Sequence, residues 1–133
     1  MFINVSNHPS RKWSQEQLQA AQELLYEDDA IVDIQFPNVA PDGATFDVQL
    51  LAEKLYEKIE SMTFGTCFPT TVMVQGEFSL THTLTNLLLK ADYGCIVACS
   101  ERSLQESILP DGTTSKKAVF KFVQFRKLYN PFI

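Results

Sequence analysis

The sequence predicts an α/β protein with a three-layer, Rossmann-like, mostly parallel sheet and a C-terminal antiparallel β-hairpin. Four short apolar runs alternate with three amphipathic stretches of helical period, an order that requires parallel strands joined by helical crossovers. Two β-prone runs then flank the turn Pro110-Asp111-Gly112, which is typical of a hairpin. The chain has 133 residues, 45% of them hydrophobic, so we expect a single domain over residues 1–133 with its own core.

The first half of the chain is expected to hold two strands and two helices. Strands are expected at residues 1–5 and 31–36, the second ending at Pro37. Ser14 is placed to cap a helix that runs to about Tyr26, before the acidic residues 27–29. A loop at residues 41–43 precedes a helix over residues 47 to about 62, whose apolar positions lie on one face.

The second half is expected to add two parallel strands, one helix and the hairpin. The parallel strands fall at residues 70–74 and 95–99, and the second is apolar throughout, as in strands buried on both faces. Ser79 or Thr81 is expected to cap the helix between them. The hairpin arms are expected at residues 103–109 and 117–125.

Composition and charge exclude several classes of protein. The net charge is −5, which argues against binding along duplex nucleic acid, although residues 1–66 hold four basic and eleven acidic residues while residues 67–133 hold seven and five. A small phosphorylated ligand therefore has a positive region available inside an acidic protein. No stretch is long and apolar enough for a membrane helix or a signal peptide. Three cysteines without metal spacing fit a cytoplasmic protein.

Sequence motifs for common cofactors are missing. The chain has no GxGxxG, no GxxxxGK[ST], no HExxH and no GxSxG, so we expect no dinucleotide, no P-loop nucleotide, no metal and no serine-hydrolase elbow. His82 is expected on the solvated face of its helix. His8 lies in a loop, where it is either structural or a general base or base-stacking group.

Three polar clusters lie where strands of the predicted sheet end. If the strands are parallel, all three clusters meet at the carboxyl edge, the usual ligand position in open α/β sheets. Glycine in the second cluster permits close approach of a ligand, and the amides of the next helix favour anions. The candidate ligand residues are Ser6, Asn7, His8, Ser10, Arg11 and Trp13 after the first strand, Gly76, Glu77, Ser79 and Thr81 after the third, and Ser100 and Arg102 after the fourth.

Each cluster also has a purely structural interpretation, and both remain open. The first cluster is equally well read as a turn and a helix cap, with Trp13 packed on the core. Glu77 is either half of an acid/base pair with Glu101 or a group that orients Arg102 or a helix-end amide. Lys116 and Lys117 either contact a phosphate, if the hairpin folds over the site, or protect a sheet edge from pairing.

The layout resembles the small stand-alone CARF-like proteins of type III CRISPR systems, which bind cyclic oligoadenylate second messengers. The resemblance covers most of the chain and rests on three segments: the first strand running into residues 6–10, the turn at residues 75–77 before a helix, and residues 100–102 after the next strand. It implies a homodimer that clasps a cyclic RNA. It also implies that some members cleave the ring without metal, through attack of a ribose 2′-hydroxyl on the neighbouring phosphate.

Carried over to this sequence, the resemblance assigns roles to individual residues. Ser6, His8, Ser10 and Arg11 would contact phosphates, while Gly76, Glu77 and Ser79 would contact ribose or base. Lys116 or Lys117 would stabilise charge on the phosphate, so that Ser10, His8 and Lys117 form the candidate catalytic set. The acidic first half of the chain departs from what a polyanionic ligand favours.

Three functions remain in competition at this point. The chain is a cyclic-oligonucleotide binding protein or ring nuclease, a binding module without catalysis, or an interaction protein with an aromatic partner surface. A homodimer is expected because the C-terminal end is unusually apolar. The surface in the third case would consist of Phe120, Phe122, Phe125, Tyr129 and Phe132.

Overall fold

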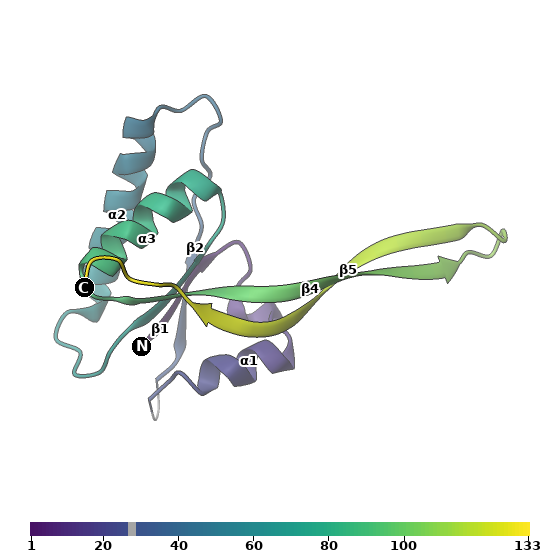
Figure 1. The fold of residues 1–133 in the computed structure, drawn as a ribbon, viewed down its shortest axis with the longest axis horizontal. Helices are drawn as coiled ribbons and strands as arrows, with labels where there is room; N and C mark the ends of the chain where they lie inside the picture. Colours follow the sequence, from purple (N-terminus) through teal and green to yellow (C-terminus); the bar gives the residue numbers. More distant parts are fainter. Residues whose placement is uncertain (27–28) are drawn as a thin grey trace.

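The computed structural model describes residues 1–26 and 29–133. It forms one five-stranded sheet in the order β2-β1-β3-β4-β5, with helices on both faces (Figure 1). Strands β1 to β4 are parallel, and β5 runs antiparallel to β4. The strands are β1 (Phe2–Ser6), β2 (Ile31–Gln35), β3 (Thr71–Gln75), β4 (Gly94–Ile108) and β5 (Thr114–Lys127), and the helices are η1 (Ser10–Lys12), α1 (Gln15–Gln22), α2 (Thr45–Thr63) and α3 (Phe78–Lys90).

The central strand β1 separates two hydrophobic clusters. All five of its residues are buried, because α1 covers one face of the sheet while α2 and α3 cover the other (Figure 1). Ile3 and Val5 belong to the cluster under α2 and α3. Phe2 belongs to the cluster under α1, where Trp13 and Phe125 pack edge-on or tilted against it. The three-layer, mostly parallel α/β fold predicted from the sequence is confirmed.

The predicted elements are all present, and the differences lie at their ends. Ser14 caps α1 as expected, since its hydroxyl accepts a hydrogen bond from the Gln17 N–H at 3.2 Å, but α1 ends at Gln22, four residues before the expected end. The acidic residues expected to end this helix include two that lie outside the described residues. Helix α2 begins two residues earlier than expected, where Asp47 accepts a hydrogen bond from the Ala44 N–H.

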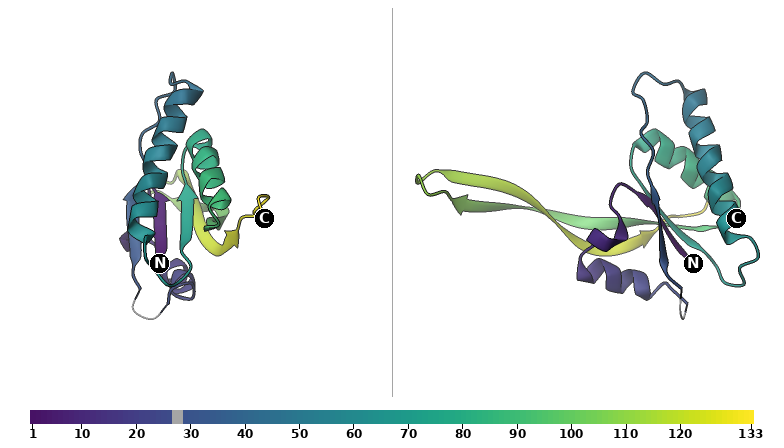
Figure 2. Two further views of the ribbon diagram at one scale, coloured as in Figure 1. Left: turned by 90° about the vertical axis from the view of Figure 1, so that its left-hand side faces the viewer. Right: turned by 180° about the vertical axis from the view of Figure 1, so that it is seen from behind.

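The largest difference is the length of the hairpin. Strand β4 continues without interruption through residues 100–102, which were expected to follow its end, and the ribbon extends far from the body (Figures 1 and 2). Pairing shifts between Cys99 and Ser100, which leaves Val123 as an extra residue on β5. Such a bulge increases local twist and bends the ribbon. Among the described residues, no helix combines the length and apolarity that crossing a bilayer requires.

Candidate functional site

The strand order makes the carboxyl ends of β1 and β3 the candidate site. The chain passes from β1 to β2 on one side, while β3 lies on the other side of β1, and the connecting helices change faces between them. Ser6 and Gln75, the last residues of β1 and β3, are register partners, so the two following loops leave the sheet side by side. Ligands of doubly wound sheets bind outside this switch in direction. We call residues 7–11 and 76–79 the switch-point edge.

A single carbonyl group organises the loop after β1. The His8 carbonyl oxygen accepts hydrogen bonds from Asn4 Nδ2 at 2.9 Å, Ser6 Oγ at 3.2 Å and Trp13 Nε1 at 2.9 Å. Ser6 Oγ also lies 2.7 Å from Asn4 Oδ1. Asn4, Ser6 and Trp13 are all buried, so their polar groups hold the loop in shape rather than face solvent. For Ser6 and Trp13, the contacts correspond to the structural interpretation of this cluster.

Asp33 ties the same loop to the neighbouring strand β2. Its carboxylate accepts hydrogen bonds from Asn4 Nδ2 at 2.8 Å and from the Ser10 backbone N–H and hydroxyl at 3.1 and 2.8 Å. The sequence analysis did not select Asp33, which sits in an alternating strand pattern where a polar residue simply indicates an outward face. Asp33 is the register partner of Asn4 in β1, and this pairing, which brings the two side chains together, is visible only in the structure. The Ser10 hydroxyl proton is therefore directed at Asp33.

Three side chains of the first cluster remain exposed at the switch-point edge. They are those of Asn7, His8 and Arg11, and the Asn7 amide oxygen accepts a hydrogen bond from Gln35 Nε2 at 2.9 Å. Arg11 occupies the last turn of η1 together with the exposed Lys12. Two cations and an imidazole thus stand beside the end of β1, in a half of the chain that is otherwise acidic.

Gly76 makes room for a ring of the protein itself. A Cβ atom at this position would lie 2.5 Å from Phe36 Cε2, far inside van der Waals contact. Phe36 is buried at the end of β2 and belongs to the main core cluster. The glycine was expected to permit close approach of a ligand; in the structure the close approach is that of Phe36.

Glu77, rather than Ser79 or Thr81, caps helix α3. Its carboxylate accepts hydrogen bonds from the Ser79 and Leu80 N–H groups at 3.0 and 2.9 Å and from the Ser79 hydroxyl. These bonds, led by that of the Ser79 hydroxyl, lower the pKa of the Glu77 carboxyl. The first amides of α3 are thus occupied by a carboxylate, as expected if Glu77 orients a helix-end amide. The buried Thr81 hydroxyl has no hydrogen-bond partner among the described residues.

An aromatic platform at the start of α3 was missed by the sequence analysis. Phe78 is 81% exposed, and its ring stacks on the His82 ring with centroids 6.1 Å apart and planes 22° apart. The available signal was the spacing of four residues on a helix, which brings the two rings together on one face. Both rings are exposed next to the end of β3, where they offer a flat surface to another planar group.

Lys116 and Lys117 lie far along the hairpin, whereas Ser100 and Arg102 follow Ala98 by only two and four residues on β4. Gln75 bonds both backbone groups of Ala98, so β4 leaves the edge of the sheet near that residue. Lys117 is the register partner of Gln105, which at a strand rise of about 3.3 Å per residue lies on the order of 20 Å farther along β4. Within one chain, Lys117 is therefore separated from His8 and Ser10.

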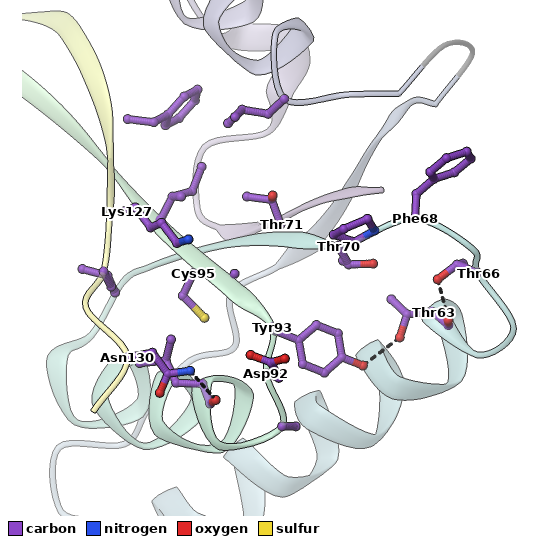
Figure 3. Close-up of a pocket in the computed structure, with 18 of the residues that line it drawn as sticks. Thr63, Thr66, Phe68, Thr70, Thr71, Asp92, Tyr93, Cys95, Lys127 and Asn130 are labelled. Atoms are coloured by element: carbon purple, nitrogen blue, oxygen red, sulfur yellow. Dashed lines mark hydrogen bonds between the residues drawn. The ribbon is translucent and has the colours of Figure 1, made fainter. Parts of the chain in front are cut away.

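A cavity lies at the opposite, amino edge of the sheet (Figure 3). It has a volume of about 1010 Å³ and is lined by parts of α1, α2, β3, the α3–β4 turn and β5. Thr63 and Tyr93 share a hydrogen bond of 2.7 Å on its wall, and Lys127 of β5 also lines the cavity. Burial raises the pKa of the nearby Cys95 thiol to about 12. None of the candidate ligand-binding or catalytic residues from the sequence is among the described residues that line this cavity, although Phe125 of the predicted aromatic surface is.

The described residues offer no cluster of three or more His, Cys, Asp or Glu side chains suited to a metal ion. The fold and the site together define a doubly wound, Rossmann-like α/β protein whose switch point carries exposed cations and aromatic rings. The chain belongs to the Uncharacterized protein MJ1673 family, whose model matches residues 1–126. Neither the curated proteins nor the solved structures contain a match to it.

Proposed function

We propose that this chain binds a cyclic oligoadenylate at the switch-point edge, as its resemblance to CARF-like proteins implies. The observation that carries the proposal is the adjacency of the β1 and β3 ends at the change of strand direction. This position is the one where doubly wound sheets hold nucleotides, independent of any sequence motif. The three free cysteines fit a cytoplasmic setting for such a messenger.

The exposed groups at this edge suit both parts of a nucleotide. Arg11 at this edge and its neighbour Lys12 supply positive charge for phosphates, and a guanidinium can form two parallel hydrogen bonds to one phosphate. Phe78, already stacked on His82, supplies a face on which an adenine can stack. Stacking of a base on an aromatic side chain contributes about 1–3 kcal/mol, which makes Phe78 the leading contact for the base.

Two placements favour binding over cleavage by a single copy. The Ser10 hydroxyl donates a hydrogen bond to the Asp33 carboxylate, so it is not available to donate one to a phosphate oxygen. Lys117 lies far along the hairpin and does not approach the same phosphate within the chain. We therefore propose a binding or sequestering module, and we treat ring opening to 2′,3′-cyclic phosphate ends as the alternative outcome of the test.

Titration calorimetry with cyclic tetra-adenylate tests the proposal. We expect binding by the wild type and roughly 5- to 100-fold weaker binding by Phe78→Ala, because one stacking contact is lost. The matched control is Phe64→Ala, which removes an 89% exposed ring that follows α2 at the other edge of the sheet. No heat with the wild type, or equal affinity of Phe78→Ala and wild type, would overturn the proposal. Chromatography of the ligand after incubation separates binding from ring opening.

A further inference from the structure

The outer part of the hairpin extends beyond the body of the protein, and no helix or strand packs on it among the described residues. We call residues 101–108 of β4 and 114–121 of β5 the arm. Every β4 residue of the arm is exposed, and the two strands extend as a ribbon beyond the body of the protein (Figure 2). A two-stranded ribbon alone is at best marginally stable in water, and it needs packing against a further element. The described residues supply no such element for the arm, since β5 contacts helix α1 at its base, where Phe125 packs in one cluster with Leu18 and Ala21.

One face of the arm carries its large apolar side chains, together with the charged residues Arg102, Glu106 and Lys116. We call it the apolar face. Alternate residues of a strand share a face, so β4 residues from Ile96 onward continue the face that packs under α1. Leu104 lies opposite Ala118 on this face, and Phe120 lies opposite Arg102. Leu104 is 62% exposed, Ile108 82% and Phe120 68%, although the side chains are large and apolar. The stripe begins at Phe122 and Phe125, whose rings lie 5.0 Å apart, and runs outward to Ile108.

The opposite face of the arm is mostly polar. On β4 it carries Ser103, Gln105 and Ser107, and on β5 it carries Lys117 and Lys121. A strand pair with one apolar and one polar face is the pattern of a sheet that is packed on one side and solvated on the other. The sequence of the arm is therefore that of a half-buried sheet, whereas the isolated chain leaves both faces in solvent.

We infer that the apolar face of the arm packs against the same face of a second copy of this chain, related by a two-fold axis near Leu104. A symmetric contact uses one patch twice and needs no other protein. The inference does not depend on the ligand proposed above.

Charge on the apolar face selects the antiparallel arrangement. Arg102 and Glu106 lie two residues on either side of Leu104, on the same face of β4. A two-fold axis near Leu104 places Arg102 of each copy close to Glu106 of the other, so that both pairs attract. Within one copy, the contact of Glu106 with a cation among the described residues is a solvent-exposed ion pair of 3.4 Å between its Oε1 and Lys116.

Sedimentation velocity at micromolar concentration tests the contact with paired variants. We expect the wild type to sediment as a dimer, at twice the chain mass of 15.1 kDa. Leu104→Glu and Phe120→Glu, alone or combined, should shift it to the monomer, because they place charge in the contact. The matched control is Ser103→Glu, on the polar face of the same strand, which should remain dimeric. Far-UV circular dichroism checks that each variant is folded.

A mixing experiment tests the antiparallel arrangement. Arg102→Glu alone and Glu106→Arg alone should each weaken the dimer at least tenfold, since each variant opposes like charges. An equimolar mixture should restore dimers that contain one copy of each, detected by native mass spectrometry. A monomeric wild type, or a dimer that Leu104→Glu and Phe120→Glu leave unchanged, overturns the inference. Failure of the mixture to form mixed dimers overturns the antiparallel arrangement.

Discussion

Gly76 shows how a single residue of the candidate site is fixed by packing. The turn after β3 must pass directly over the Phe36 ring, and only hydrogen fits at that point. Sequence reasoning located the turn and its glycine but assigned the space to a ligand. The sequence does not state which neighbouring strand brings an aromatic ring to the turn, so the contact with Phe36 could not be predicted. Here that strand is β2, whose chain continues past Gln35 to Phe36.

We predict that Gly76→Ala lowers the free energy of unfolding by about 1–3 kcal/mol, because the added methyl group forces the buried Phe36 ring to move. Urea denaturation measures the change. The control is Gly94→Ala, at a position where the nearest atom would lie 3.7 Å from the new Cβ, an ordinary contact. A loss for Gly94→Ala as large as that for Gly76→Ala would contradict this explanation.

At the scale of elements, helix α3 depends on its carboxylate cap. Glu77 occupies the position before the helix, and its carboxylate reaches the Ser79 and Leu80 N–H groups. Sequence analysis favoured Ser79 or Thr81 because hydroxyl residues are common caps. A carboxylate serves equally well at this position, since it satisfies the same amides and interacts favourably with the positive end of the helix.

We predict that Glu77→Gln reduces the loss of stability that the wild type shows on acidification. The folded-state pKa of Glu77 lies below its ordinary value of 4.5, so its stabilising effect is present above that pH. The effect is lost as the pH falls through the lowered folded-state pKa. Thermal melting between pH 6 and pH 3 measures this dependence, with Glu57→Gln on the exposed surface of α2 as the control. Identical pH profiles for wild type and Glu77→Gln would contradict the assignment.

The hairpin shows which properties of an element can be predicted from neighbouring residues in the sequence. Its turn at Pro110-Asp111-Gly112 and its β-prone arms could be predicted because turn chemistry and alternation are written in neighbouring residues. Its length could not, because β4 passes from a buried apolar run into an exposed polar one and stays paired with β5 beyond the register shift at Cys99 and Ser100. The polar residues 100–102 resemble a strand end in the sequence. In the structure they mark the point where β4 leaves the body of the protein and becomes exposed.

At the scale of the whole molecule, the two edges of the sheet differ in kind. The carboxyl edge carries cations, an imidazole and the Phe78–His82 platform on the surface. The amino edge carries the cavity of about 1010 Å³, whose described lining includes Tyr93 and Lys127. Sequence order predicts the first edge, since parallel strands bring their loops together. The cavity is lined by residues from many separate elements, so no local pattern in the sequence predicts it.

The most direct test of the account is an NMR titration of the labelled protein with cyclic tetra-adenylate, followed by backbone amide shifts. The account predicts that the largest shifts fall at the switch-point edge, in residues 7–11 and 76–79, with the aromatic signals of Phe78 and His82 moving alongside. Largest shifts around Tyr93 and Lys127 at the amino edge, or no shifts at all, would contradict it.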